Sequence, residues 1–528
     1  PGYDYQPDWS PDGRSIVYAS SRGAAIELML LDLETGRSAQ LTHGGAVNVE
    51  PRFSPDGHRI VFVSSAYQRH LHVFLAEVRG QELAEPVRLT GENRSALPRY
   101  YYSAYDHEIN PVWTRDGTAI VYVSNRGHIY GTGGFWRMPV SAGAEATELH
   151  YEETSWQARP DFSPDGQRLV YSSYLGRNTL QLWLLPAVAG GDPVALSYGD
   201  FDETGARWSP DGQQIAYISN RGGGLELRLL RFPGGSSRAL EISERRRLRP
   251  GGLLHLTVRD DHDAATPARV VVTDAAGRFY GPSGAWLHHA EFDRNEYPFE
   301  ARYFHTAGDE LIEVPAGPVS VEVMKGLART PVRRSVTVNP GATSELAVVL
   351  PARRWPDGAG RHWVSADVHV HVNYGGHYRN TPAHLVLQAE AEDLDIVENL
   401  VVNKEQRYPD IAYSGRGVDP ASTPATLVVH GQEFHTSYWG HLGLLGGQGQ
   451  TLLPGYAGYP NTAAASLYPM NADVADLAHA QGALVGYVHP FEEDPRPLTH
   501  PAHTDADELP VDVALGKVDY LEIVSFAD

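Results

Sequence analysis

The side chains best suited to chemistry lie in the stretch "ADVHVHVNYGG", residues 366–376, which alternates valine with polar residues as a strand does. Side chains two apart on a strand point to the same face, about 6.5 to 7 Å apart, so Asp367, His369 and His371 share one face. The alternating valines form the other face. Two histidines placed in this way can hold one metal ion or help to bridge two.

Further histidines and a carboxylate lie downstream of this strand. The segment 362–528 holds half of the chain's 24 histidines. Within it, "GQEFHTSYWGHLG" places Glu433 and His435 on one face of a strand end and His441 beyond it, and "GYVHP" ends another strand with His489. The chain has no cysteine, so any metal must be held by imidazole and carboxylate groups, the ligands of hydrolytic Zn, Mn or Fe sites. We therefore predict a divalent metal site.

Strands and helices that alternate along the segment 362–528 must position these residues. One predicted helix starts with Thr381 as N-cap and Pro382 in its first turn, and another runs from an Asn471 cap to a Gly482 stop. The predicted strands cover residues 367–372, 395–402, 425–434, 483–490 and 518–524. This order is typical of an α/β barrel, in which functional residues gather at the ends of the strands.

The motifs "DVHVH", "GQEF", "GHLGLLG" and "GYVHP" resemble those of the PHP superfamily of metallohydrolases, specifically its CehA/McbA-like branch. The resemblance implies that the metal ligands are His369, His371, Glu433, His441 and His489. It also implies a PHP-type, distorted TIM-like barrel. The implied activity is hydrolysis of an ester-like bond (carbamate, carboxylic ester, amide or phosphoester) by metal-bound water.

We expect catalytic roles for Asp367, Glu433 and His489. Asp367 shares a strand face with the paired histidines, where it would orient one of them or accept a proton. His435 lies close to Glu433 in the sequence. It would be either a further metal ligand or a hydrogen-bond donor to a residue that binds the metal.

Two features depart from the family pattern. The family's Asp-His pair after the second strand falls on Val401 and Val402, so either a residue among Glu398, Asn399, Asn403 and Lys404 replaces it or one metal position is lost. The chain also ends at "EIVSFAD", where a complete barrel would continue, so we expect an incomplete barrel and further ligands beyond Asp528.

A five-residue phrase recurs along residues 1–247 at spacings of 44, 60, 49 and 46, and each copy precedes an apolar strand. Proline presets φ, aspartate bonds the backbone ahead of it and glycine takes a left-handed conformation, so each phrase predicts a hairpin turn. Repeats of 40 to 50 residues built from short strands indicate a β-propeller, and here they resemble the TolB type. That resemblance implies about six blades, so we expect part of one before residue 1. The five phrases are WSPDG (9–13), FSPDG (53–57), WTRDG (113–117), FSPDG (162–166) and WSPDG (208–212).

Two other segments complete the expected organisation. The tyrosine-rich insertion 94–110 is either a loop at the propeller mouth that contacts a ligand or a packed connection. Residues 248–352 show short alternating strands similar to carboxypeptidase-regulatory or fibronectin-like β-sandwiches. The predicted protein is thus a propeller (1–247), a sandwich (248–352) and an incomplete metallohydrolase domain (362–528).

Composition limits the partners. Asp and Glu number 65 against 43 Lys and Arg, a net charge of −22, which disfavours nucleic acid and anionic membranes as partners. No apolar run reaches the length of a membrane span. We expect a small-molecule or peptide-like substrate. The propeller would serve as an access or docking module, with a protein partner bound to it. By resemblance alone we expect a periplasmic or secreted location.

Two other functions compete with the hydrolase. A serine peptidase would need a G-x-S-x-G elbow, and the chain contains none. A non-enzymatic, propeller-based binding protein with a degenerate metal domain is favoured by the loss of the Asp-His pair and disfavoured by retention of the other motifs.

Overall fold

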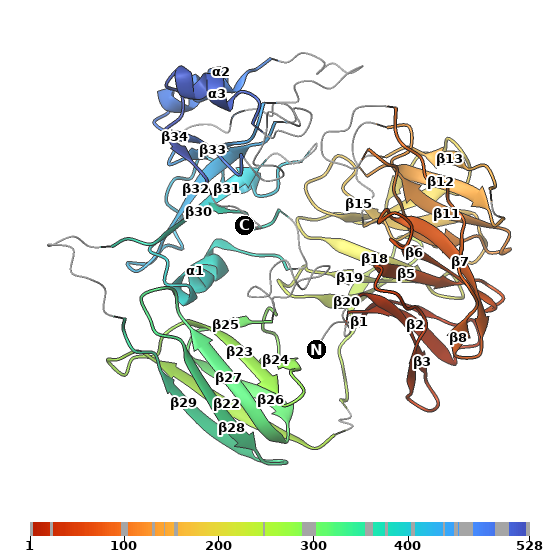
Figure 1. Ribbon diagram of the computed structural model, residues 1–528, viewed down its shortest axis with the longest axis horizontal. Helices are drawn as coiled ribbons and strands as arrows, with labels where there is room; N and C mark the ends of the chain where they lie inside the picture. Colours follow the sequence, from red (N-terminus) through yellow and green to blue (C-terminus); the bar gives the residue numbers. More distant parts are fainter. Residues whose placement is uncertain are drawn as a thin grey trace. The chain divides into compact units, whose positions relative to one another are not determined.

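The computed structural model divides into two compact units, Pro1–Ser243, here the propeller unit, and Glu244–Asp528, here the C-terminal unit (Figure 1). The residues that the structure describes are 4–21, 25–96, 104–128, 132–141, 143–152, 157–245, 249–287, 302–353, 363–374, 378–402, 407–436, 439–447, 452, 468–490 and 506–523.

The described part of the propeller unit forms five antiparallel sheets, one for each turn phrase. The all-β propeller is thereby confirmed. Four sheets have four strands in chain order, and the second has five because β9 pairs with β7. The strands are β1 (Asp4–Trp9), β2 (Ser15–Ser20), β3 (Glu27–Asp32), β4 (Ser38–Gln40); β5 (Asn48–Phe53), β6 (Arg59–Ser64), β7 (His72–Arg79), β8 (Glu82–Leu83), β9 (Val87–Arg88); β10 (Glu108–Trp113), β11 (Ala119–Ser124), β12 (Gly134–Pro139), β13 (Thr147–His150); β14 (Asp161–Phe162), β15 (Arg168–Ser173), β16 (Gln181–Pro186), β17 (Val194–Ala195); and β18 (Glu203–Trp208), β19 (Gln214–Ser219), β20 (Glu226–Arg231), β21 (Ser237–Ala239).

Each turn phrase joins the first and second strands of its sheet, as predicted. In the first phrase the Ser10 hydroxyl donates to Asp12 Oδ1 over 2.6 Å, and the Arg14 N–H donates to the same oxygen over 3.0 Å. Gly13 has φ of 70°, a left-handed conformation that glycine adopts without steric cost. The turn is therefore stabilised by its own side chains, which explains why its sequence repeats so closely.

A chain of polar contacts ties successive sheets together. The N–H of Glu50 donates to Gln6 Oε1 over 2.8 Å, that of Asn110 to Glu50 Oε2 over 2.5 Å, and that of Arg159 to Asn110 Oδ1 over 2.8 Å. All four residues have positive φ, and Gln6, Glu50 and Asn110 sit at a register shift in the first strand of their sheets. At each register shift, the side chain of one residue therefore accepts a hydrogen bond from the backbone of the corresponding residue in a neighbouring sheet.

Because the turn aspartates accept hydrogen bonds when ionised, we expect the protein to lose stability against unfolding when they are protonated in acid. Hydrogen bonds from Thr114 and Thr118 lower the pKa of Asp116 from 3.8 to about 2. Because the folded-state pKa is depressed, this stabilisation is present above pH 3.8 and disappears as the pH falls through about 2. We expect Asp116→Asn to unfold at lower urea concentration than wild type at pH 7, and the difference to shrink steadily between pH 4 and pH 2. A difference that is constant over that range would contradict this account.

The C-terminal unit begins with a β-sandwich. One sheet has the order β26-β22-β29 and the other β24-β23-β27-β28, with β25 paired to β23. The buried residues of both sheets form one apolar core, to which β22 contributes every second residue. The domain limits 248 and 352 remain a prediction. The strands are β22 (Gly251–Arg259), β23 (Ala268–Asp274), β24 (Phe279–Tyr280), β25 (Phe304–Thr306), β26 (Asp309–Pro315), β27 (Gly317–Met324), β28 (Val332–Val338) and β29 (Thr343–Val349).

A six-stranded mixed sheet with three helices follows the sandwich in the chain. Its order is β30-β31-β32-β33-β34-β35. Helix α1 packs on β31 and β32, and α2 and α3 share a core with β33 and β34. The elements are β30 (Ala366–Val370), α1 (Pro382–Ala391), β31 (Ile396–Val402), a 3-10 turn (Ile411–Tyr413), β32 (Leu427–Phe434), β33 (Leu442–Leu445), α2 (Asn471–Ala480), β34 (Leu484–Tyr487), α3 (Leu509–Ala514) and β35 (Tyr520–Leu521).

The predicted barrel is not what the described strands show. They form an open sheet, and β33 is antiparallel to both neighbours, β32 and β34. Only about seven residues connect β32 to β33, too few for the crossover of a dozen or more that a parallel neighbour needs. Strands β30 and β31 are parallel, and helix α1 connects them along the chain, as the predicted alternation of strands and helices requires.

One helix start agrees with the sequence prediction and one does not. Thr381 caps α1, and its side chain accepts from the His384 N–H, as expected. For α2 the cap position is Met470, and Asn471 is the first helical residue. The Glu508 carboxylate accepts the Asn471 N–H over 2.7 Å, so the Asn471 side chain is left for other contacts.

The sandwich contacts the end of α1 through a charged network. Glu392 Oε1 lies 2.6 Å from Arg269 Nε and 2.7 Å from His305 Nε2. Burial alone would raise the pKa of Glu392, but the hydrogen bonds from His305 and Arg269 bring it below its usual value. This network joins β23 and β25 of the sandwich to the end of α1.

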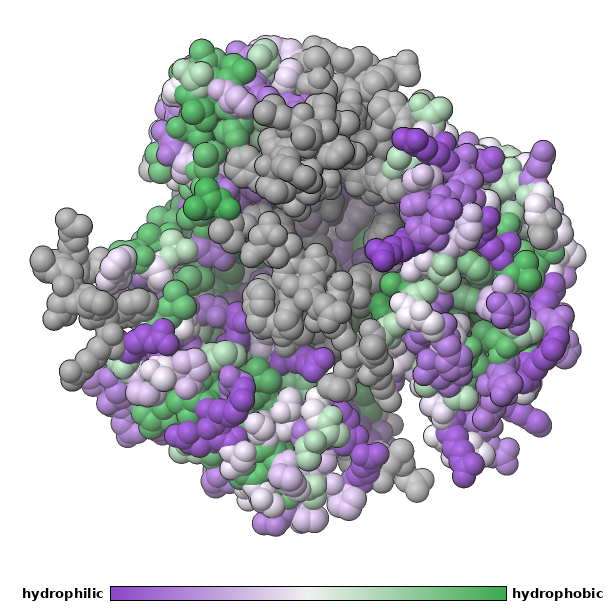
Figure 2. Space-filling model, in the orientation of Figure 1, coloured by the Kyte–Doolittle hydropathy of each residue, from purple (hydrophilic) through white to green (hydrophobic). Residues whose placement is uncertain are grey.

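Apolar residues gather on the surface over α2, α3 and β34 (Figure 2). The exposed large hydrophobic residues of these elements are Leu477, Leu484, Val511 and Val513. In the described part of the chain this surface has no cover. Among the described helices, none combines the length and apolarity needed to cross a lipid bilayer.

Candidate metal centre

Glu433 lies near the end of β32 and is surrounded by imidazole nitrogens. The residue is only 2% exposed. Its Oε2 lies 2.9 Å from His371 Nε2 and 3.7 Å from His369 Nε2, and both histidines come from β30 or the residue just after it. The structure thus brings together the first three predicted ligands, although β30 ends at Val370, before His371.

The other oxygen of Glu433 faces the remaining predicted ligands. Its Oε1 lies 3.2 Å from His441 Nδ1 and 3.3 Å from His489 Nε2, and these two nitrogens are 3.4 Å apart. His435 stacks on His441 with ring centroids 3.6 Å apart. We call Glu433, His369, His371, His441 and His489 the Glu433 cluster. Each carboxylate oxygen in it faces two imidazoles.

The protons of the first histidine pair follow from their partners. His371 Nδ1 lies 2.9 Å from the Leu400 carbonyl oxygen, and His369 Nδ1 lies 2.8 Å from Glu522 Oε1. Both partners can only accept, so both Nδ1 atoms carry hydrogen. In neutral imidazoles the two Nε2 lone pairs then face each other across 3.1 Å and face the Glu433 carboxylate. Such an arrangement requires a cation between them, either a proton or a metal ion.

The pKa values of Glu433 and His369 are both shifted in the direction that favours a charged carboxylate and a positively charged imidazole. Burial alone would raise the pKa of Glu433, but the hydrogen bonds from the four histidines hold it well below its usual range. Burial alone would lower the pKa of His369, but the carboxylates of Glu433 and Glu522 raise it to about 9. The cluster therefore stabilises a cation.

The spacing and chemistry of the cluster fit a divalent metal. Zinc bonds of 2.0 to 2.2 Å in tetrahedral geometry place neighbouring ligand atoms about 3.3 to 3.6 Å apart. The four nitrogen–oxygen distances to Glu433 range from 2.9 to 3.7 Å around that value. Imidazole and carboxylate ligands also suit zinc, manganese and iron.

Other predicted residues lie outside the cluster. Asp367 is exposed, and its carboxylate accepts the His369 N–H over 3.1 Å. Val401 and Val402 are buried, and Val402 is the register partner of Glu433, so apolar side chains lie where the resemblance would place an Asp-His pair.

The residues considered as replacements for that pair have other partners. Glu398 accepts the Gly446 N–H over 2.9 Å. Asn399 accepts the Val372 N–H over 3.2 Å, and its amide nitrogen lies 3.1 Å from His430 Nδ1. Asn403 and Lys404 lie outside the described residues.

Sequence analysis missed Glu522 as a site residue. Its carboxylate contacts His369 Nδ1 through Oε1 and accepts the His489 N–H through Oε2 over 2.9 Å. His489 has a positive φ of 33°, which this bond helps to hold. Its position in the sequence could have indicated this role. Glu522 directly follows β35, and β35 is the parallel neighbour of β34, the strand that precedes His489.

Asn471 also supports the cluster. Its amide nitrogen donates to the Gly440 carbonyl over 3.0 Å and contacts Tyr487 Oη over 3.0 Å. Gly440 precedes His441, so Asn471 fixes the backbone that carries this ligand. The start of α2 is therefore connected to the Glu433 cluster.

Two glycines next to the cluster make room for Tyr520. Gly443 and Gly486 are register partners of each other, and Gly443 is also paired with Glu433. A Cβ on Gly486 would overlap the Tyr520 ring. Tyr520 therefore lies across the sheet at these two positions.

We expect Gly486→Ala to lower the free energy of unfolding by about 1 to 3 kcal/mol, because the ring must move off the sheet. Urea denaturation measures the change. Gly224→Ala is the control, since a Cβ there meets open space. Equal effects of the two substitutions would refute the packing role of Gly486.

The fold and the site together define a multidomain β-propeller protein whose second unit carries a cluster of histidines around one glutamate. No protein-family model matches the chain. The chain is 26% identical over 242 residues, 45% of its length, to the Tol-Pal system protein TolB of Francisella tularensis subsp. tularensis strain WY96-3418. It is 34% identical over 87 residues, 15% of its length, to the uncharacterized peptidase YuxL of Bacillus subtilis strain 168. These matches support the TolB-like propeller.

The chain spans 51% of that TolB protein and 13% of YuxL. Among solved structures, the putative TolB from Agrobacterium tumefaciens matches with a TM-score of 0.37 and 19% identity, covering 45% of this chain and 80% of that one.

Proposed function

We propose that the C-terminal unit is a metal-dependent hydrolase that acts on an ester-like bond. The Glu433 cluster carries this proposal, because a buried carboxylate with two imidazoles on each oxygen is built to hold cations. Glu433 Oε2 with His369 and His371 would hold one ion. Oε1 with His441 and His489 would hold a second.

A bound Zn, Mn or Fe ion lowers the pKa of a water molecule toward 7 and polarises the scissile group. The chain's own groups orient the ligands. The Leu400 carbonyl accepts from His371, and Glu522 accepts from both His369 and the His489 backbone. These contacts engage the Nδ1 atoms, so Nε2 is the ring nitrogen of His369 and of His371 that faces Glu433 and would bind the ion.

A second candidate is a propeller-based binding protein with a degenerate metal domain. Val402 beside Glu433 favours it, since a ligand of the family pattern is missing there. The relative named as a Tol-Pal system protein supports the same candidate and, with it, a periplasmic location and a protein partner on the propeller.

Hydrolysis assays separate the two candidates. The purified protein, loaded in turn with Zn²⁺, Mn²⁺ or Fe²⁺, is tested on aryl carbamate, ester, anilide and phosphodiester substrates. The hydrolase proposal predicts turnover of at least one class, lost with chelator, restored by metal and absent in His371→Ala. Turnover that is unaffected by chelation and by His371→Ala would overturn it, and no turnover with any metal would favour the binding protein.

A further inference from the structure

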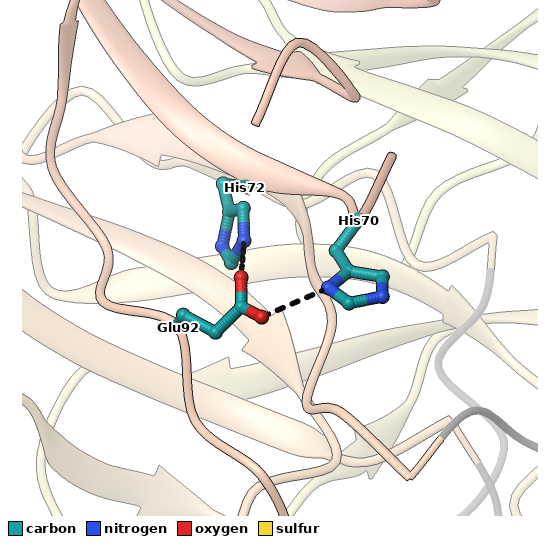
Figure 3. A group of neighbouring side chains, drawn as sticks. All are labelled: His70, His72 and Glu92. Atoms are coloured by element: carbon teal, nitrogen blue, oxygen red, sulfur yellow. Dashed lines mark ion pairs between the residues drawn. The ribbon is translucent and has the colours of Figure 1, made fainter. Parts of the chain in front are cut away.

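A second group of side chains of metal-ligating types lies within the propeller unit. His70 precedes β7, His72 is the first residue of β7, and Glu92 follows β9. Figure 3 shows the Glu92 carboxylate with one oxygen facing each imidazole. We call these three residues the propeller cluster. It lies next to the tyrosine-rich insertion 94–110, whose Tyr105 stacks on His70 with centroids 4.2 Å apart.

The ligand atoms of the propeller cluster converge without forming hydrogen bonds. Glu92 Oε1 lies 3.3 Å from His70 Nδ1, and Oε2 lies 3.5 Å from His72 Nε2. His70 Nδ1, His72 Nε2 and Glu92 Oε2 are buried atoms that have no hydrogen-bond partner among the described residues. Three such atoms side by side are costly unless something binds them. The two nitrogen–oxygen distances lie in the range of roughly 3.3 to 3.6 Å between neighbouring ligands of a tetrahedral zinc ion, and one ligand atom from each residue lies within 4.8 Å of the others.

A buried carboxylate orients the central imidazole. His72 is fully buried, and its Nδ1 lies 2.8 Å from Glu108 Oε2, on the first residue of β10. An ionised Glu108 would accept the Nδ1 hydrogen, and His72 would then present a bare Nε2 lone pair to Glu92. Metal-bound histidines commonly have such a carboxylate behind them. The lone pair and the Glu92 carboxylate then face a point that only a cation satisfies.

A neighbouring sheet shows what a simple His–Glu pair looks like in this fold. His128 Nε2 lies 2.8 Å from Glu148 Oε1, a hydrogen-bond distance, and the His128 ring stacks on Tyr151 with centroids 4.0 Å apart. Like His70, His128 contacts a glutamate and stacks on a tyrosine. It provides a matched control without the second histidine.

We propose that His70, His72 and Glu92 bind one divalent transition-metal ion, with Zn²⁺ as the best fit. Two imidazoles and one carboxylate form a known zinc ligand set that leaves a fourth position open. The side chains of His70 and Glu92 are 23% and 18% exposed, so an ion can enter and a water molecule or an anionic ligand can take that position. The ion would join the loop before β7 to the loop after β9.

Zinc counting on the whole protein tests this site independently of the hydrolase proposal. Wild type, His70→Ala/His72→Ala and His128→Ala are saturated with Zn²⁺, desalted and analysed for zinc per chain. We expect the double variant to hold one equivalent less than wild type and His128→Ala to match wild type. Equal zinc in wild type and the double variant would overturn the proposal, whatever the Glu433 cluster binds.

Two conservative variants keep the test valid if the double variant is unstable. Glu92→Gln keeps the side-chain shape and removes a ligand, so we expect zinc affinity at this site to fall more than about 100-fold. Glu108→Gln changes only the group behind His72, and about a 10- to 100-fold loss is expected. Unchanged zinc affinity in both variants, with normal circular dichroism, would show that the propeller cluster is a proton-linked network.

Discussion

Glu433→Gln is expected to abolish metal binding at the Glu433 cluster and hydrolysis with it. Replacing only a group behind a metal ligand costs about 10- to 100-fold in affinity or activity, so loss of the shared ligand should cost more than about 100-fold in each. Glutamine offers one oxygen in place of two, and its amide NH₂ would face one of the histidine pairs that now face a carboxylate oxygen.

The measurement is metal content and turnover after saturation with Zn²⁺ or Mn²⁺. Glu345→Gln is the control, because Glu345 also contacts a histidine, His255, at 2.6 Å but lies in the sandwich. Wild-type metal content and turnover in Glu433→Gln would refute the assignment of Glu433 as the central ligand.

The second large effect is expected at Glu522, which touches two members of the cluster without facing Glu433 itself. Glu522→Gln keeps one acceptor oxygen and loses the other, so either His369 Nδ1 or the His489 N–H loses its partner. We expect about a 10-fold loss of metal affinity in Glu522→Gln and about 100-fold in Glu522→Ala. Activity at saturating metal should recover more in the glutamine variant.

A titration with Zn²⁺ followed by turnover distinguishes positioning from a structural role. Asp519→Asn is the matched control, because Asp519 holds His479 at the same 2.8 Å only three residues earlier. The account fails if Glu522→Ala binds metal as tightly as wild type, or if Asp519→Asn weakens binding equally.

The parts of this structure that sequence predicts are the local ones. The S-P-D-G turns form from contacts within about five residues, so their strands and the propeller could be predicted without coordinates. The start of α1 likewise depends on Thr381 and Pro382 alone. The histidine motifs could be grouped because each ends or follows a strand, and strand ends meet at one edge of a sheet.

What could not be predicted depends on distant partners. The cap of α2 comes from Glu508, some 37 residues away, so the local preference of Asn471 for the cap was overridden. Glu522 acts on His369 across 153 positions of sequence. The antiparallel strand β33 was missed because "GHLGLLG" has only four strand residues and no alternation. The propeller cluster joins residues from two loops, and neither loop has a recognisable metal motif.

Anomalous X-ray diffraction from crystals of the whole protein grown with Zn²⁺ tests the central claim most directly, because it locates each ion without relying on activity. The account predicts anomalous density about 2.0 to 2.2 Å from Glu433 Oε2 and the Nε2 atoms of His369 and His371. A second peak is expected at Glu433 Oε1 with His441 and His489. A fully ordered Glu433 cluster without anomalous density at saturating Zn²⁺ would contradict the proposed metallohydrolase.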